Sequence, residues 1–206
     1  MKNNKIGFMV DGVLIDTSKF MLENGEKFLE GKVHYINEGA SKFTEMFNCS
    51  KEVSDIFWKQ YFRKYCLRTK PEKDAVDVLK QLKKNGNEIY IITSRIHITD
   101  KSFTGELYRA MLKHWLNKNS IPFDGLIYCD NEKNYEDELN ACKKIKIDTI
   151  ITDKISGAIA LSEISDIILL NRPYNKGLYQ TKIRRAENFK EVYPIIEDED
   201  IKRRIR

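Results

Sequence analysis

Hydroxyl and acidic side chains follow four short apolar runs of this sequence, each at the point where the run ends. Carboxylates are the oxygen ligands that Mg²⁺ prefers, while hydroxyls and the N–H groups of helix N-termini bind phosphate oxygens. The residue types therefore predict a site for a phosphate group and Mg²⁺. The residues at these ends are Met9, Asp11, Gly12, Thr93, Ser94, Arg95, Asp130, Thr152 and Asp153.

The apolar runs themselves have the composition of strands in a parallel sheet. Most are apolar throughout, as expected when helices cover both faces, and segments of helical period lie between them. This alternation predicts an α/β fold with an open, mostly parallel, five-stranded sheet. Ligands of such sheets bind at the carboxyl ends of the strands, so the side chains above are expected to meet. The predicted strands are residues 6–10, 88–93, 125–129, 149–152 and 166–170.

The connecting segments carry their own signals. Residues 72–86 place Ala75, Val78, Leu79 and Leu82 on one helical face. Residues 104–119 predict a helix with Leu107, Met111, His114 and Trp115 on its packed stripe. Ser156 is the expected N-cap of a third, short helix.

One connection is far longer than a strand–helix–strand crossover needs. The residues from Gly12 to Glu88 include two helical segments rich in aromatic side chains, and these predict an inserted helical bundle. The aromatic side chains are expected to pack this bundle, and part of it could overhang the strand ends as a lid. The closely spaced aromatic residues are Phe57, Trp58, Tyr61, Phe62 and Tyr65.

Composition limits the class of protein. The 206 residues are 41% hydrophobic and 33% charged, typical of one globular domain with room for an insertion. No apolar run approaches the roughly 20 residues that span a bilayer, and no secretory signal pattern is visible. The four cysteines lack metal-binding spacing and predict reduced thiols in a cytoplasmic protein. The net charge of +5 and the tail from Lys182, with its mixed charges, indicate a solvated face, and a nucleic-acid partner is not expected.

The motifs in this order resemble the haloacid dehalogenase superfamily, specifically its deoxyribonucleotidase-like phosphatases with a helical cap. The resemblance lies in "DGVLIDT" (11–17), "IYIITSR" (89–95), "IDTIITDKISGAIALSE" (147–163) and "LLNRPYN" (169–175). It implies a haloacid dehalogenase-like Rossmannoid core formed by residues 1–17 and 71–206. Residues 18–70 would be the small inserted cap.

The resemblance also implies roles for individual residues. The position of Met9 would hold the aspartate that attacks phosphorus, and Asp11 would be the general acid/base, with its carbonyl near Mg²⁺. Thr93, Ser94 and Gly12 would hold phosphate oxygens. Lys133 is the candidate for the lysine that neutralises the phosphate, with Lys143 and Lys144 as alternatives. Asp16 matches a further acid of the first motif, although a helix cap or hinge residue is the favoured explanation.

Two departures from the family pattern change this expectation. Met9 replaces the nucleophile, and Thr152 replaces the first of two acids, leaving Asp11 and Asp153 for a metal. A thioether is a poor ligand for Mg²⁺ and cannot act as a carboxylate nucleophile. The sequence thus predicts weak Mg²⁺ binding or none.

The first hypothesis is a pseudo-phosphatase that binds a phosphorylated small molecule, either a nucleotide or a sugar phosphate, or a protein partner. The alternative is an active phosphomonoester hydrolase, a 5′-nucleotidase or sugar-phosphate phosphatase, that uses Asp11 and Asp153. Histidines add little to either hypothesis, because His34, His97 and His114 are not spaced as a metal pair. Only His97, just after Arg95, is expected near the site.

Overall fold

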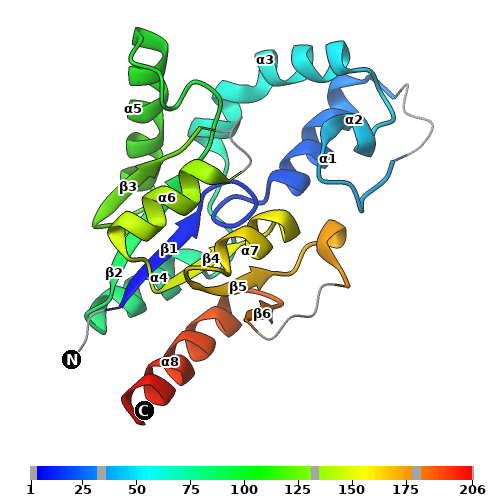
Figure 1. Cartoon of the computed structure of the whole chain (residues 1–206). Coiled ribbons are helices and arrows are strands. Elements are labelled where there is room, and N and C mark those ends of the chain that lie inside the picture. The colour runs from blue at the N-terminus through cyan, green and yellow to red at the C-terminus, as the bar shows by residue number, and fades with distance from the viewer. Residues whose placement is uncertain (1–3, 32–35, 131–134, 178–181, 206) are drawn as a thin grey trace.

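The centre of the protein is a parallel sheet of six strands, in the order β3-β2-β1-β4-β5-β6 (Figure 1). A computed structural model describes residues 4–31, 36–130, 135–177 and 182–205. This order reverses its winding between β1 and β4, which is where open α/β sheets bind their ligands. The α/β fold predicted from sequence is confirmed. The strands are β1 (Lys5–Met9), β2 (Glu88–Thr93), β3 (Gly125–Tyr128), β4 (Thr149–Thr152), β5 (Asp166–Leu170) and β6 (Ile183–Ala186).

Helices cover the sheet on both faces, which is why the central strands are apolar throughout. The helices α6 (Glu136–Ile145) and α7 (Ile155–Leu161) lie together over one face (Figure 1). The helices α4 (Ala75–Lys84) and α8 (Phe189–Ile205) contact each other on the opposite face. The four predicted apolar residues of α4 are all buried, as the periodicity indicated.

The prediction of five strands was wrong, because the tail adds a sixth. β6 pairs with β5 at the edge of the sheet and buries Ile183 and Ala186. Its two arginines are not simply solvated: Arg184 donates to the carbonyl of Ile195 at 2.9 Å, and Arg185 donates to Asn175 Oδ1 at 2.9 Å. A four-residue edge strand with two charged members has no apolar run that would reveal it.

Two local predictions about helices fail, one of them only in part. In α5 (Phe103–Lys118) Trp115 is buried and Met111 packs against the core, as predicted, but His114 is exposed and Leu107 is 45% exposed. The face turned inward is set by α3, against which α5 packs. Ser156 is not an N-cap; α7 starts after Lys154, and the Ser156 hydroxyl lies 3.0 Å from that of Tyr135.

The long connection after β1 forms the helices α1 (Thr17–Phe28), α2 (Phe43–Met46) and α3 (Lys51–Arg68), which lie together beyond the carboxyl ends of the strands (Figure 1). Asp16 caps α1 by accepting from the backbone N–H of Lys19 at 2.9 Å. The predicted aromatic packing is confirmed: Phe57 is fully buried and its ring stacks on that of Phe43, with centroids 4.1 Å apart.

Two further sequence expectations concern membranes and thiols. Within the described residues, no helix combines the length and apolar character that a membrane crossing requires. All four cysteines are free, and three of them are buried.

Candidate functional site

A small cavity of about 100 Å³ lies at the carboxyl ends of β1, β2 and β4. We call it the strand-tip pocket. Six of the residues singled out from the sequence line it, so the expectation that these strand ends converge is met. The lining residues are Met9, Val10, Asp11, Ile92, Thr93, Ser94, Tyr135, Glu138, Thr152, Asp153 and Lys154.

Asp11 is bound on both carboxylate oxygens by Arg95. The Nε of Arg95 donates to each Asp11 oxygen at 3.0 Å, and its NH2 group donates to Oδ1 at 2.7 Å. The Arg95 side chain is only 5% exposed and that of Asp11 is 31% exposed, so water screens this ion pair only in part. A guanidinium that donates to both oxygens of a carboxylate is a strong and directional partner. Arg95 therefore holds Asp11 as a carboxylate that accepts hydrogen bonds.

The inserted helices reach the same carboxylate. Tyr65 of α3 donates its hydroxyl to Asp11 Oδ1 at 2.5 Å and accepts from Thr17 Oγ1 at 2.8 Å. The Thr17 oxygen in turn accepts from the backbone N–H of Gly12 at 3.0 Å. A continuous chain of hydrogen bonds therefore joins α3, α1 and the loop after β1, with Asp11 at its end.

These contacts decide the ionisation of Asp11. Burial opposes the charged form, but the charge and hydrogen bonds of Arg95, together with the Tyr65 hydroxyl, outweigh it, so the pKa of Asp11 is lowered. Burial and the neighbouring Asp11 raise the pKa of the Tyr65 phenol well above its ordinary value. Asp11 is thus held ionised and paired, which is the wrong state for donating a proton.

Two buried polar atoms of the pocket have no hydrogen-bond partner among the described residues. They are the hydroxyl oxygen of Thr93 and Oε2 of Glu138, and both side chains belong to residues only 2% exposed. Burial raises the pKa of the Glu138 carboxyl, although a hydrogen bond from Ser94 partly offsets this. Buried polar atoms are nearly always satisfied in folded proteins, so two such atoms in one cavity indicate that a ligand or water completes them.

Met9 and Thr152, which the resemblance places where two acids are expected, line the same pocket. Met9 is 8% exposed at the end of β1, and Thr152 is 2% exposed at the end of β4. The Thr152 hydroxyl accepts from the backbone N–H of Lys154 at 3.4 Å, a turn contact that any short hydroxyl side chain can make. Lys154 directly follows Asp153 in the sequence and brings a cationic side chain to the lining of the pocket.

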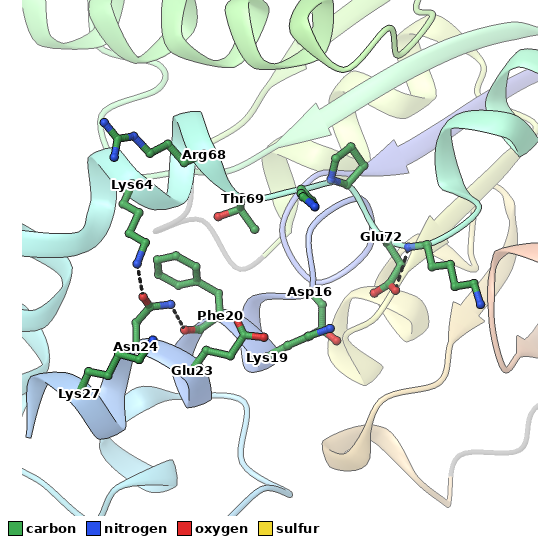
Figure 2. A pocket seen from close by; sticks show the side chains of 13 residues that line it. Asp16, Lys19, Phe20, Glu23, Asn24, Lys27, Lys64, Arg68, Thr69 and Glu72 are labelled. Atoms are coloured by element: carbon green, nitrogen blue, oxygen red, sulfur yellow. Dashed lines mark hydrogen bonds between the residues drawn. The ribbon is translucent and has the colours of Figure 1, made fainter. Parts of the chain in front are cut away.

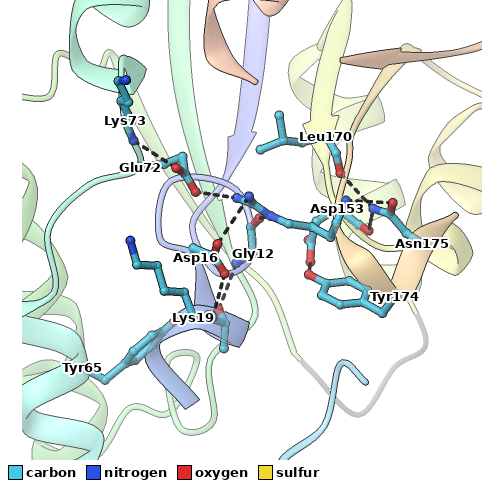
Figure 3. A network of polar contacts seen from close by, with 12 residues as sticks. Gly12, Asp16, Lys19, Tyr65, Glu72, Lys73, Asp153, Leu170, Tyr174 and Asn175 are labelled. Atoms are coloured by element: carbon cyan, nitrogen blue, oxygen red, sulfur yellow. Dashed lines mark hydrogen bonds and ion pairs between the residues drawn. The ribbon is translucent and has the colours of Figure 1, made fainter. Parts of the chain in front are cut away.

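Asp153 is held on the opposite side of the loop after β1. Tyr174 donates its hydroxyl to Asp153 Oδ2 at 2.5 Å, and the Asn175 amide donates to the Asp153 carbonyl at 2.6 Å (Figure 3). The carboxylate packs directly on Gly12, where an added Cβ would overlap it, and Gly12 has a φ of +83°. Burial raises the pKa of Asp153 despite the Tyr174 hydrogen bond.

Arg172 ties this loop to the segment that follows α3. Its Nε donates to the Gly12 carbonyl at 3.0 Å, and its NH2 group pairs with Glu72 at 2.9 Å. A second, longer ion pair joins it to Asp16 at 3.5 Å. Asp16 precedes the inserted helices and Glu72 follows them, so Arg172, whose side chain is 10% exposed, joins both ends of the insertion to the loop after β1.

The donor set of the pocket does not fit Mg²⁺, which the family resemblance implies. Mg²⁺ needs an octahedron of oxygens anchored by free carboxylates. Here the Asp11 oxygens are taken by Arg95 and Tyr65, Asp153 accepts from Tyr174, and Met9 and Thr152 bring no charge. Among the described residues, no group of three or more His, Cys, Asp or Glu side chains could hold a metal ion.

Several residues predicted from the sequence are not among those that line the strand-tip pocket. Lys133 and His34 fall outside the described residues. His97 has its ring nitrogen 2.8 Å from Asp100 Oδ2 and lines a separate groove between α3 and α5. Lys143 and Lys144, the alternatives to Lys133, are in the last turn of α6 and do not line the pocket.

The sequence predictions give no site role to Tyr65, Glu138 or Lys154. Arg95 is placed at a strand end without a role, and Tyr65 is expected only to pack the inserted bundle. Tyr65 and Arg95 are 54 and 84 residues from Asp11 in sequence, so no local pattern could pair them. Lys154 follows Asp153 directly, and that adjacency was the one available signal.

Comparisons with known proteins give a family and a fold for this chain. A family model described as 5' nucleotidase, deoxy (pyrimidine), cytosolic type C protein (NT5C) matches residues 3–203. The comparison with curated protein sequences gives no match.

Solved structures share the fold at low sequence identity. A haloacid dehalogenase-like hydrolase from Streptococcus pneumoniae has a TM-score of 0.62 and 16% identity, covering 95% of this chain and 100% of that one. A predicted phosphatase from Clostridium acetobutylicum has a TM-score of 0.61 and 18% identity, with coverage of 95% and 99%. A predicted phosphoglycolate phosphatase from Haemophilus somnus has a TM-score of 0.61 and 14% identity, again with coverage of 95% and 99%.

Proposed function

Since the chain belongs to the NT5C family of 5′ nucleotidases, within the haloacid dehalogenase-like fold, we propose that it binds a phosphorylated small molecule without hydrolysing it. The phosphate would occupy the strand-tip pocket, and the ligand would be a nucleotide or a sugar phosphate. Residues 18–70 would form the cap over a core of residues 1–17 and 71–206, in a cytoplasmic protein.

The observation that carries this proposal is the double engagement of Asp11. In the family mechanism this position must give and take a proton, and the preceding acid must attack phosphorus. Arg95 and Tyr65 keep Asp11 paired and ionised, and Met9 has no nucleophilic oxygen. General acid catalysis needs a group whose pKa lies near the working pH, and a carboxyl with a lowered pKa is far from that.

Binding of phosphate is supported by the polar atoms that the fold leaves open. The buried Thr93 hydroxyl has no described partner and can donate to a phosphate oxygen. Lys154 supplies positive charge to the same cavity. Methionine and threonine in place of two carboxylates also remove negative charge that would repel the phosphate when no metal is bound.

The experiment that tests the proposal is calorimetric titration of the full chain with orthophosphate and with a nucleoside 5′-monophosphate, in EDTA and in Mg²⁺. We expect the same affinity under both conditions, since the metal has no part in binding. Thr93→Val should abolish the phosphate signal, and Thr104→Val, on the exposed first turn of α5, should leave it unchanged. Binding that requires Mg²⁺ would favour the alternative, a hydrolase that uses Asp11 and Asp153 as metal ligands.

A further inference from the structure

A second cavity, of about 440 Å³, opens between α1, the end of α3 and the segment that returns the chain to the sheet (Figure 2). We call it the basic cleft. None of its 13 lining residues lines the strand-tip pocket, so it is a separate site. Its volume lies within the range of cavities that enclose small molecules.

Positive charge dominates the lining of the cleft. Three acidic side chains also line it, but Asp16 and Glu72 are already paired with Arg172 at 3.5 and 2.9 Å. None of the cationic groups has a described ion pair within the cleft, and of the three acids only Glu23 is not paired with Arg172, so the lining carries an excess of positive charge. The cationic residues are Lys19, Lys27, Lys64, Arg68, Lys70 and Lys73.

Hydrogen bonds to neutral groups hold parts of the cleft in place. Lys64 Nζ donates to Asn24 Oδ1 at 2.6 Å, and the buried Asn24 amide donates to the Phe20 carbonyl at 2.8 Å (Figure 2). The backbone carbonyl of Thr69 accepts from the indole of Trp115 at 2.7 Å, which anchors the returning segment. One cation and one wall therefore hold defined positions before any ligand arrives.

A buried hydroxyl in the lining supports a ligand of this kind. The hydroxyl oxygen of Thr69 has no hydrogen-bond partner among the described residues, although it is buried. A buried polar atom without a partner is unusual, and a phosphate oxygen would accept its hydrogen bond. The cleft thus offers one open hydroxyl donor beside several flexible cations.

We propose that the basic cleft binds a small polyphosphate anion, either free or as the phosphate chain of a nucleoside triphosphate. A single phosphate would leave most of the surrounding charge unneutralised, because the cations come from α1, from the end of α3 and from the segment that directly follows α3. A chain of adjacent phosphates would contact more of these cations at once. Lysines suit this ligand because each acts as a movable point charge on a phosphate oxygen. This site goes beyond the proposed function and does not depend on it.

The test is calorimetric titration of the full chain with tripolyphosphate in EDTA, with orthophosphate present to fill the strand-tip pocket. The double variant Lys64→Ala/Arg68→Ala should weaken binding at least about tenfold, because two charge-assisted contacts are lost. The control Lys113→Ala/Lys118→Ala removes two exposed cations from α5 and should change nothing. Thermal unfolding of both variants checks that they remain folded.

Further ligands separate the possible sources. Binding of ATP at least as tightly as tripolyphosphate would support the proposal. It would also indicate that the ligand is a nucleoside triphosphate and not a free polyphosphate chain. Adenosine should not bind. Equal weakening by the two double variants would mean that the anion binds basic surface in general, and this would overturn the proposal. Loss of tripolyphosphate binding in Thr93→Val would also overturn it, because the anion would then occupy the strand-tip pocket.

Discussion

The guanidinium of Arg95 contacts both carboxylate oxygens of Asp11, with its Nε 3.0 Å from each. The arginine follows β2 and the aspartate follows β1, and these neighbouring strands are joined in register along their length. In a pocket of this fold the position of Asp11 would be expected to face a substrate, yet here it faces a cation supplied by the chain itself.

Removing that cation should destabilise the protein strongly. Arg95→Met leaves the partly buried Asp11 carboxylate, whose side chain is 31% exposed, without an ionic partner, so we expect the free energy of unfolding to fall by about 2 kcal/mol. The double variant Asp11→Asn/Arg95→Met should recover part of that loss. Chemical denaturation measures both values. Lys83→Met, which breaks the more exposed pair with Asp124, should cost at most about 1 kcal/mol, and an equal cost at the two sites would contradict the account.

The ion pair between Asp11 and Arg95 also predicts how the stability of the fold depends on pH. The pKa of Asp11 is lowered in the folded state, so its contribution is fully present above the unfolded value near 4 and is lost as pH falls through the folded value. Wild-type protein should therefore lose stability on acidification below about pH 4 more steeply than Asp11→Asn. Thermal melts at a series of pH values test this. Parallel curves for the two proteins would show that Asp11 is not preferentially ionised in the fold.

Two threonines near the pocket should respond oppositely to the same change. Thr93→Val removes a buried hydroxyl without a described partner, so stability should be unchanged or rise by up to about 1 kcal/mol while phosphate binding is lost. Thr17→Val removes a hydroxyl bonded to Tyr65 and to the Gly12 N–H, so stability should fall by about 1–2 kcal/mol. Denaturant titrations with and without phosphate compare them. A destabilised Thr93→Val would mean that its hydroxyl is already satisfied.

Anion binding in the pocket should weaken as pH rises. Glu138 and Asp153 both have raised pKa values because of burial, so each gains negative charge beside the anion as pH rises through its folded pKa. Sulfate is a suitable probe because it does not itself titrate in this range. We expect its affinity to fall as pH rises above the ordinary carboxyl range of about 4, and to fall less in Glu138→Gln. An unchanged pH profile in this variant would exclude Glu138 from the pocket's electrostatics.

The parts of this molecule that sequence could predict are those governed by local patterns. The buried strands are readable because residues such as Ile167 to Leu170 are apolar in an unbroken run, and their ends converge because parallel strands share an edge. β6 is not readable, because its pairing depends on β5 and not on its own composition. The partners of Asp11 are likewise tertiary: Tyr65 comes from the inserted helices and Arg95 from the next strand of the sheet. The sequence shows that Met9 and Thr152 lack carboxylates. It does not show that the carboxylate of Asp11 already accepts hydrogen bonds from Arg95 and Tyr65.

The central claim, that the pocket binds phosphate but does not cleave phosphomonoesters, is tested most directly by turnover of the unmodified protein. A panel of nucleoside monophosphates and sugar phosphates would be assayed for released phosphate, with Mg²⁺ and with EDTA, at protein concentrations where phosphate binding is measurable. The account predicts no release above a sample lacking protein, under either condition. Mg²⁺-dependent turnover on the order of 1 per second or faster, an ordinary enzyme rate, would contradict it.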